Sequence, residues 1–414
     1  MTDRPLTILL VVAHLAHRSG LSLYVQNLAT ELHRRGHRPI VYSSRNGAVA
    51  AQLRNSTIPV LDQLDAMGVA PDVIHGNNYS ETLLALLHFP SSPAVFTCHG
   101  WASAKNRPPS HPRIRRFVPV DQTCRDRLLY EHAVPPELIE VQYNFVDMAR
   151  FAPRPPLPTR PSRAFVFGTK LKPEHLQLIT EECERRGVTL HVLGSESIDN
   201  PEIILRDYDL VFARGRCALE SMAVGAALIV CGREGMGPMA TTQNFDELRS
   251  LNFGMRALRA PVTREDVVRV VETYDAADAM AVSRRLRAQA SLDGAVTEML
   301  ATYTAVIDEH RATVYDRREE DLAIARFVAE VEAQAQRDRE RTREVRNRLA
   351  EVKAQAHRDR EQWRSKLEQL QARHGRLKSK LKKTQHELAA VKPGVVRRLQ
   401  SYLKKSVNPG PSES

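Results

Sequence analysis

The sequence lacks a long uninterrupted apolar run and has few cysteine and aromatic residues. Its 414 residues include five cysteines, and 6% of its side chains are aromatic. The first apolar segment, Leu6 to Leu15, is interrupted by His14 and lacks a cleavable small-residue site. It is also shorter than the about 20 residues that a membrane-spanning helix needs. We therefore expect a buried strand here instead of a signal peptide, and a cytoplasmic protein.

Several sequence motifs of common sites are also missing. The cysteines form neither a CxxC pair nor a cluster with histidine, which excludes the usual zinc and disulfide frameworks. No GxGxxG and no Walker-type GxxxxGKS or GxxxxGKT is present, which disfavours nicotinamide dinucleotides and P-loop chemistry. Asp207-Tyr208-Asp209 spells DxD, but it precedes an apolar strand that we expect Asp209 to begin. We predict no metal site.

Excess charge of one sign is absent from most of the chain. Residues 1–310 hold 34 Lys or Arg and 34 Asp or Glu, whereas residues 311–414 hold 26 and 15. The whole net charge of +11 therefore lies in the C-terminal quarter. Any anionic partner is expected there, and the N-terminal part has to be interpreted from its motifs.

The first 150 residues alternate apolar runs with helical patterns, which is typical of a parallel sheet with crossover helices. Gly20 begins a helical stretch that ends at Arg34-Arg35-Gly36, and Asp121 is placed to cap another helix. We predict strands at residues 6–13, 39–42, 73–75, 94–98 and 117–120.

A proline-rich segment divides this alternation into two halves. Residues 151–162 read FAPRPPLPTRPS, with five prolines, and cannot continue a helix or a central strand. After this segment we predict strands at 164–167, 189–193, 209–212 and 227–231, and helices at 173–186 and 217–224. The fold class expected is α/β, with two Rossmann-like doubly wound domains over 1–150 and 163–310 and a linker between them.

A heptad repeat follows from about Ile324. Seam positions step by four and three from Ile324 to Trp363 and, after one extra residue, from Leu367 to Val391. This pattern predicts a helix of about 68 residues, roughly 100 Å long. We expect a coiled coil over 320–392 that makes the protein a homo-oligomer; a solvated single helix is the alternative.

Pro393-Gly394 is expected to end that helix, and a basic tail over 393–414 follows. Residues 395–407 read VVRRLQSYLKKSV, a short amphipathic stretch that fits either an anionic membrane surface or a frayed helix end. Nucleic acid is a weaker candidate partner because acidic residues are interleaved with the basic ones and aromatic side chains are scarce.

Two residues suggest a ligand site before any family is considered. The helix at Gly20 follows the first strand directly, so its free N–H groups point to the crevice where anions bind in such folds. Glu220, on the helix after a buried strand, is placed to accept hydrogen bonds from the two hydroxyls of a ribose. Its alternative role is to favour the first turn of its own helix.

Four segments, in order, make residues 1–310 resemble a GT-B fold glycosyltransferase of family 4, a group of retaining enzymes that use nucleotide sugars. They resemble the glycine loop and first helix, the two histidine-bearing strand ends, the link into the second domain, and the donor-binding helix. The segments are SGLSLYVQNLATELHRRGHRPIVYS (19–43), PDVIHGNN (71–78) with FTCHGW (96–101), VQYNFVDMARFAP (141–153) and ARGRCALESMAVGAALIVCG (213–232).

The resemblance implies a role for each matching residue. Gly20 approaches the donor phosphates, His99 is the catalytic-site residue beside the transferred sugar, and Glu220 holds the ribose. Lys170 or Lys172 offsets the diphosphate charge. The other implied donor-binding residues are Arg216 and the segment Gly235, Met236 and Gly237, which would present backbone N–H groups as a small nest.

The sequence also departs from the family. The second glutamate that usually lies eight residues before the ribose-binding one is replaced by Phe212, while Gly215 matches. The missing carboxylate ordinarily helps to hold the donor sugar. His75 ends a strand as His99 does, and a hydrogen-bonded scaffold role is at least as consistent with the sequence as a substrate contact.

The resemblance implies transfer of a sugar from a UDP- or GDP-linked donor to an acceptor hydroxyl, with retention and without a metal or other cofactor. Synthesis of cell-surface glycans or glycoconjugates at the inner face of the membrane is the expected setting, with an unknown glycan or lipid-linked acceptor. Two alternatives are a non-catalytic nucleotide-sugar-binding scaffold that assembles through its coiled coil, and a GT-B fold nucleotide-sugar epimerase.

Overall fold

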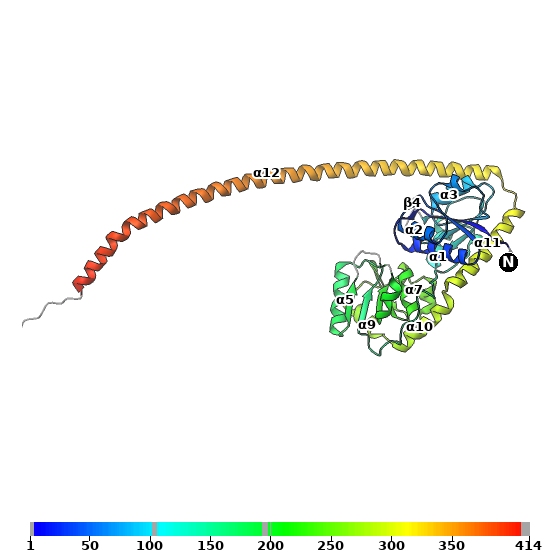
Figure 1. The fold of residues 1–414 in the computed structure, drawn as a ribbon, viewed down its shortest axis with the longest axis horizontal. Coiled ribbons are helices and arrows are strands. Elements are labelled where there is room, and N and C mark those ends of the chain that lie inside the picture. The colour runs from blue at the N-terminus through cyan, green and yellow to red at the C-terminus, as the bar shows by residue number, and fades with distance from the viewer. Residues whose placement is uncertain (1–3, 102–105, 193–197, 199, 407–414) are drawn as a thin grey trace, which may run out of the picture. The chain divides into compact units, whose positions relative to one another are not determined.

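A computed structural model of the chain describes residues 4–101, 106–192, 198 and 200–406. The chain divides into two compact units, residues 1–328 and 329–414. The first unit holds two parallel-sheet lobes, and the second is helical (Figure 1). Leu193 and Val407, which end two predicted segments, lie outside the described residues.

The first lobe is built on a six-stranded sheet in the order β5-β3-β1-β6-β7-β8. All its neighbouring strands are parallel. Each strand predicted in this half of the chain is present, with ends shifted by at most three residues. The bounds are β1 Thr7–Val11, β3 Arg38–Tyr42, β5 Val60–Leu61, β6 Val73–Gly76, β7 Ala94–Cys98 and β8 Ile114–Pro119.

Helix α1 (Gly20–Arg34) shows how local sequence fixes an element of this lobe. Ser19 caps it: Ser19 Oγ accepts from the Ser22 N–H, and Ser22 Oγ lies 2.8 Å from the Ser19 amide nitrogen. Its buried face contains Val25, Leu28 and Leu32 at helical spacing. The lobe also contains β2 His14–Leu15, β4 Arg45–Asn46, α2 Ala48–Asn55, α3 Tyr79–His88 and α4 Gln122–Asp126, which Asp121 caps as predicted.

The second lobe has a five-stranded sheet in the order β10-β9-β11-β12-β13. Four strands are parallel, and the edge strand β13 pairs antiparallel to β12. The strands are β9 Arg163–Val166, β10 Thr189–Val192, β11 Leu210–Ala213, β12 Ala227–Gly232 and β13 Gly235–Met239. The helices are α5 Pro173–Arg185, α6 Pro201–Ile204, α7 Gly215–Val224, α8 Phe245–Ser250, α9 Arg264–Glu272 and α10 Ala276–Gln289.

The next helix, α11 (Leu292–Ala312), differs from the predicted domain division, which assigned residues 163–310 to the second domain. Its buried residues Val296, Met299, Tyr303 and Val306 pack with Ile8 and Leu10 of the first sheet. Periodicity in a sequence identifies a buried helix face but does not say which core covers it. The second lobe therefore ends near Ala290, and the chain returns to the first.

The proline-rich segment is also packed more firmly than a free linker. Phe151 is fully buried in the second lobe, and Arg154 donates from its backbone N–H to the carbonyl of Val224. The two chain crossings between the lobes instead lie side by side at Val146. Its N–H donates to Ala290 O at 2.8 Å, and its carbonyl accepts from the Leu292 N–H at 2.9 Å.

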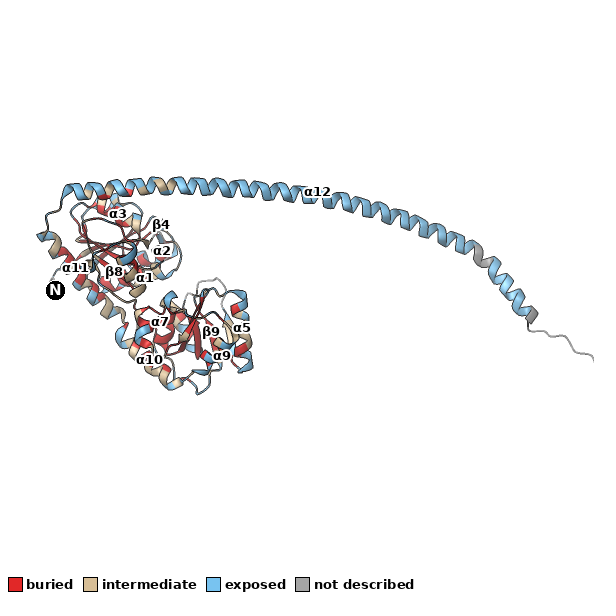
Figure 2. Ribbon diagram, turned by 180° about the vertical axis from the view of Figure 1, so that it is seen from behind, coloured by how far each residue is buried: buried red, intermediate tan, exposed pale blue. Residues whose placement is uncertain are grey.

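Helix α12 (Arg317–Ser406) extends through the second unit, and exposed residues cover nearly all of it (Figure 2). The helix passes through Pro393 and Gly394, so the prediction that it ends there is wrong. A proline removes one backbone donor but does not prevent helical residues from following it. No helix in the described ranges has both the length and the apolar character needed to cross a membrane.

Candidate functional site

The carboxyl ends of the parallel strands in the first lobe carry a network of side chains. Asn77 follows β6 and His99 follows β7, so both lie at the same edge of the sheet. Asn77 Nδ2 donates to the carbonyls of Val11, at 3.1 Å, and His75, at 3.3 Å. Its Oδ1 is thereby directed toward His99 Nε2, at 2.8 Å.

This network defines the tautomer of His99. Because Asn77 Oδ1 accepts, Nε2 of the imidazole carries the hydrogen, and Nδ1 keeps a lone pair that has no partner among the described residues. The ring of Tyr24, from α1, meets the imidazole edge-on with ring centres 4.6 Å apart. Burial lowers the pKa of His99 to about 3, so the ring is neutral at physiological pH. His99 is thus held in one orientation as a hydrogen-bond acceptor.

His75, the other strand-end histidine, is fully buried and has both ring nitrogens occupied. Nδ1 lies 2.5 Å from Tyr303 Oη, and Nε2 lies 2.8 Å from Thr97 Oγ1. Tyr303 belongs to α11, so the histidine fixes that returning helix to the first sheet. No nitrogen of His75 is left for a substrate, and its role is the scaffold role that the sequence left open.

Gly20 begins α1, immediately after the Ser19 cap, and is exposed. A Cβ built on Gly20 meets nothing within 4 Å. A ligand can therefore approach this end of α1 without a clash with neighbouring side chains. The position agrees with the predicted helix N-terminus, although the cap already occupies the Ser22 N–H.

In the second lobe, α7 follows β11 and carries the predicted pair Arg216 and Glu220. Arg216 Nε donates to Glu220 Oε1 at 2.7 Å, and the two side chains are 13% and 6% exposed. The structure thus brings these two predicted donor-binding residues into direct contact. The buried carboxylate is oriented by an arginine one turn away.

The N-terminus of α7 is closely approached by the loop after β9. Gly168 has φ +65°, and a Cβ there would lie 2.2 Å from Cys217 Sγ. Only glycine fits this approach. The loop then leads to Lys170 and Lys172, which are exposed, and Lys172 directly precedes α5.

The nest predicted at Gly235, Met236 and Gly237 is wrong because these residues form β13. The Met236 N–H donates to Ala260 O at 2.9 Å, and Met236 is buried. A Cβ at Gly235 would lie 2.5 Å from Ala260 O, and one at Gly237 still closer to Ala257 O. The two glycines therefore allow backbone packing, and the Met236 amide is not free for a phosphate.

Phe212 and Asp209 have structural roles. Phe212, where the resemblance implies a second glutamate, is fully buried in β11 and supplies no polar group. Asp209 precedes β11 as predicted and accepts hydrogen bonds from Ser162 and Arg154. Burial raises the pKa of Asp209, but these bonds outweigh that effect and lower it. Among the described residues, no cluster of three or more His, Cys, Asp or Glu is placed to hold a metal ion.

Sequence reasoning missed Asn77, Tyr24 and Arg249. Asn77 lies inside a quoted motif, so its place beside a strand end was visible; the contacts of Tyr24 and Arg249 depend on tertiary packing. Arg249 is buried, donates from Nη2 to Asn144 O at 2.7 Å, and has no hydrogen-bond partner for Nη1 within the described residues. Burial lowers the pKa of Arg249 to about 10.

The lobes also contact each other through side chains. Arg256, of the second lobe, places Nη1 2.5 Å from Asp126 Oδ2 in α4 and its guanidinium carbon 5.8 Å from the centre of the Trp101 ring. Trp101 follows His99 by two residues. The segment that carries His99 is thus adjacent to a contact between the two lobes.

Comparison with known proteins agrees with the predicted resemblance. Residues 18–150 match the model of Glycosyltransferase Family 4, which covers about a third of the chain. No curated protein matches the sequence.

Among solved structures, a glycosyltransferase from Rickettsia africae has a TM-score of 0.54 at 14% identity, covering 73% of this chain and 99% of the other. The Anabaena protein HepE, solved with UDP, has a TM-score of 0.50 at 14% identity, covering 72% of this chain and all of the other. At such identities the likeness concerns the fold. The chain resembles the GT-B glycosyltransferases, as predicted, and carries a long C-terminal helix besides.

Proposed function

We propose that the protein transfers a sugar from a nucleoside diphosphate donor to an acceptor hydroxyl, with retention at the anomeric carbon. The observation that carries this proposal is that each sheet has a suitable residue at its carboxyl edge. The first sheet has a neutral, oriented His99, and the second has a buried Glu220 bound by Arg216. The family match over residues 18–150 and the UDP-bound HepE structure support a nucleotide-sugar donor.

In this proposal Glu220 accepts hydrogen bonds from the ribose hydroxyls. The diphosphate lies at the N-terminus of α7, where Lys170, Lys172 and Arg216 offset its charge. Such fixed donors stabilise the charge that develops on a departing diphosphate, and no metal is needed for that step. Arg216 stays beside Glu220 and orients its carboxylate.

His99 acts on the sugar in the same scheme. Its Nδ1 accepts a hydrogen bond from a sugar hydroxyl and holds the ring of the sugar in place, while Nε2–H remains on Asn77. The neutral imidazole adds no positive charge next to the oxocarbenium-like sugar of the transition state. Since no carboxylate nucleophile has been identified beside His99, we propose no covalent intermediate.

A non-catalytic nucleotide-sugar-binding scaffold is the second candidate, and Phe212 favours it. The buried ring replaces a carboxylate that ordinarily helps to hold the donor sugar, so a ligand that is bound but not turned over fits the residue present. The GT-B epimerase alternative needs acid and base groups around the sugar. Neither the sequence nor the described site residues point to such a cluster.

Thermal denaturation with a panel of UDP- and GDP-linked sugars identifies the donor, because a ligand that binds the native state raises the Tm. Release of free nucleotide, followed with and without candidate glycan or lipid-linked acceptors, then measures turnover. A Tm shift with turnover supports the transferase. A shift without turnover for any acceptor favours the scaffold, and the absence of any shift contradicts nucleotide-sugar binding.

A further inference from the structure

The seam of α12 is an apolar stripe without a partner in the single chain. Nine of its large residues between 345 and 388 are 52–71% exposed. They recur on one face at heptad spacing, in the pattern of a coiled-coil seam. These residues, here called the α12 seam, are Val345, Leu349, Val352, Trp363, Leu367, Leu370, Leu377, Leu381 and Leu388.

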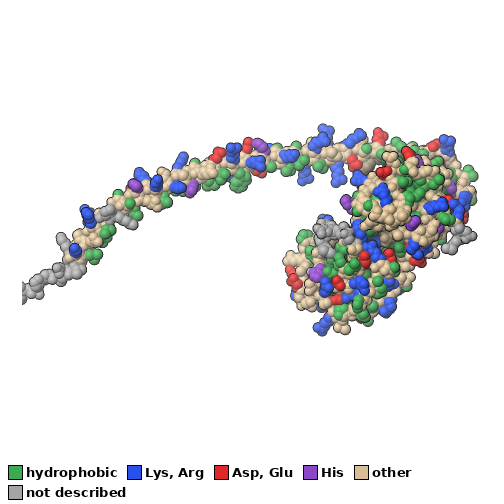
Figure 3. Space-filling view, viewed as in Figure 1, with side chains coloured by type: hydrophobic (Ala, Val, Ile, Leu, Met, Phe, Trp, Pro, Cys, Tyr) green, Lys and Arg blue, Asp and Glu red, His purple; other side chains and the backbone are tan. Residues whose placement is uncertain are grey.

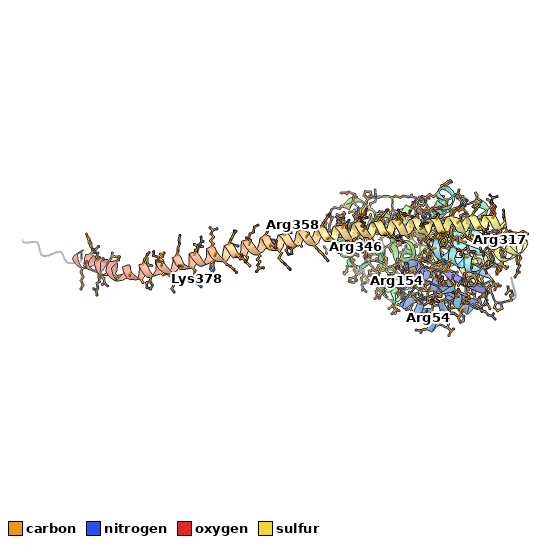
Figure 4. All side chains as sticks on the ribbon, turned by 90° about the horizontal axis from the view of Figure 1, so that it is seen from above. Arg54, Arg154, Arg317, Arg346, Arg358 and Lys378 are labelled. Atoms are coloured by element: carbon orange, nitrogen blue, oxygen red, sulfur yellow. The ribbon has the colours of Figure 1, made fainter. Side chains whose placement is uncertain are left out.

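The positions that flank this seam are basic on both sides. From 332 to 387, the positions next to the seam, e and g of the heptad, hold ten Lys or Arg, five Gln, and only Glu332 and Glu387 as acidic residues. Blue side chains accordingly project along the whole helix in Figure 3, and Arg346 and Lys378, two of the flanking residues, stand out from it in Figure 4. The basic flanks are Arg339, Arg341, Arg346, Arg348, Lys353, Arg360, Lys366, Arg373, Lys378 and Lys380.

Most glutamates of α12 between residues 329 and 388 lie instead on the side away from the seam. There His357 Nδ1 lies 3.7 Å from Glu361 Oε1, and Arg364 Nε lies 3.6 Å from Glu368 Oε1, each pair being four residues apart. These intrahelical pairs stabilise the helix on its outer face. Neither pair involves one of the basic flanks.

This distribution disfavours a second copy of the chain as the partner. In a parallel pair, g of one helix faces the following e of the other, which would oppose Arg341 to Arg346 and Arg348 to Lys353. In an antiparallel pair, e faces e and g faces g, and these positions are basic as well. Both arrangements place like charges along the edges of the seam.

Two aspartates inside the seam add to the same conclusion. The segments AQAQRDRE (333–340) and AQAHRDRE (354–361) repeat after 21 residues, or three heptads. In each repeat a glutamine donates to the seam aspartate, Gln334 to Asp338 at 3.0 Å and Gln355 to Asp359 at 2.8 Å. A parallel, in-register pair of identical helices would bury each aspartate against its own copy.

A flat anionic membrane fits the stripe less well than a helix does. A strict heptad stripe drifts by about 20° per heptad around a straight α-helix, and so by about 100° over the five heptads from Ile324 to Asp359. A flat surface cannot follow this drift, whereas a second helix follows it by supercoiling. The seam is also narrow, and membrane-surface helices present a wider apolar face.

We propose that α12 forms a heterotypic coiled coil with a helix of another protein whose flanking positions are acidic. That helix presents Asn, Lys or Arg at two seam positions about 31 Å apart, the length of 21 helical residues, opposite Asp338 and Asp359. The proposal revises the homo-oligomer that the heptad pattern alone predicts, and it does not depend on the proposed activity.

The test uses the full-length chain and two synthetic helical peptides. Both peptides carry an apolar seam complementary to residues 329–363, with Asn facing the two aspartates; one has Glu at all flanking positions and the other has Lys. We expect at least tenfold tighter binding of the Glu peptide by titration calorimetry. Sedimentation equilibrium is expected to show that the chain alone is monomeric at about 10 µM. Equal binding of the two peptides overturns the proposal.

Reversing the charge of two flanking residues distinguishes a partner helix from a second copy of the chain. The double variant R341E/R348E places glutamates opposite Arg346 and Lys353 of a parallel second copy, so we expect it to self-associate more than the wild type and to bind the Glu peptide at least tenfold more weakly. The matched control R343E/R376E changes the same charge on the outer face and is expected to do neither. Far-UV circular dichroism checks that both remain helical.

Two results would assign another partner. A wild-type chain that is already a dimer at about 10 µM makes a second copy the occupant. Tight binding of phosphatidylglycerol vesicles without any preference for the Glu peptide makes the occupant an anionic lipid surface. Either result overturns the heterotypic coiled coil.

Discussion

The carboxyl edges of the two sheets differ in the charge of the side chains that they carry. At the first edge, Asn77 and His99 form a neutral network, and the histidine has a pKa of about 3 because it is buried. At the second edge, Arg216 and Glu220 form a charged pair, and the loop that approaches α7 at Gly168 leads to the exposed Lys170 and Lys172. A neutral edge suits a sugar, and a charged edge suits a nucleoside diphosphate. The two lobes share a similar α/β fold, but the side chains at the carboxyl edges of their sheets differ.

The largest effect is expected from removal of the charge at the second edge. Glu220→Gln keeps the shape of the side chain but loses the charged acceptor for ribose, so we expect about 100-fold weaker nucleotide binding, or about 2.7 kcal/mol. Glu234→Gln is the matched control, because Glu234 is an exposed carboxylate 3.4 Å from Arg214. Calorimetry with UDP and GDP measures both; unchanged affinity in E220Q would remove Glu220 from the site.

The next largest effect is expected on stability, from the close contact between Gly168 and Cys217 at the second edge. Gly168→Ala places a methyl group against Cys217 and an alanine at φ +65°, so we expect a loss of roughly 2 to 3 kcal/mol in the free energy of unfolding. Gly68→Ala, where a Cβ meets nothing within 4 Å, is expected to change it by less than about 0.5 kcal/mol. Urea denaturation compares them. Equal stability of the two variants would contradict the close approach.

At the first edge, Asn77 is a positioning residue, and its variants test the neutrality of His99. Asn77→Ala frees the imidazole, and we expect about a tenfold lower kcat with little change in the donor KM. Asn77→Asp places a carboxylate 2.8 Å from Nε2 and raises the pKa of His99. The pH profile of N77D should then gain a transition between about pH 5 and 7 that the wild type lacks.

Asn55→Asp, on an exposed residue at the end of α2, is the control for the added charge. It should leave the profile unchanged. A wild-type enzyme that already shows a histidine transition in this range would argue against a neutral, buried His99.

The smallest effect is on stability as the pH falls. Burial lowers the pKa of His75 to about 3 and that of His111 to about 4, against 6.5 for an exposed histidine. The unfolded chain therefore binds more protons than the folded one below pH 6.5, and stability decreases as the pH falls through this range. At pH 5.5 we expect a loss of roughly 1 kcal/mol for each histidine relative to pH 7.5.

Urea denaturation at the two pH values measures this loss. His75→Gln keeps a hydrogen-bonding side chain without a titrating group, and its stability should depend less steeply on pH than that of the wild type. A steeper dependence in H75Q would contradict the neutral histidine.

Much of the fold was predictable because local patterns determine it. The alternation of apolar runs identified the buried strands, Gly20 and Asp121 marked helix starts, and the heptads marked α12. Predictions that needed the identity of a packing partner were less successful. Helix α11 has an ordinary amphipathic pattern, yet it packs on the first lobe, and Gly235 to Gly237 form a strand because Ala257 and Ala260 lie against them.

The sequence by itself determined which residues are apolar, which glycines interrupt them, and where the charges lie, including the basic flanks of α12. Only the tertiary structure decided that both ring nitrogens of His75 are hydrogen-bonded, to Tyr303 and Thr97, while Nδ1 of His99 has no partner among the described residues. It also decided that the Met236 N–H donates to Ala260 O. The reason is physical. Chain neighbours set propensity and charge, but whether a polar group is satisfied depends on atoms that arrive from distant parts of the sequence.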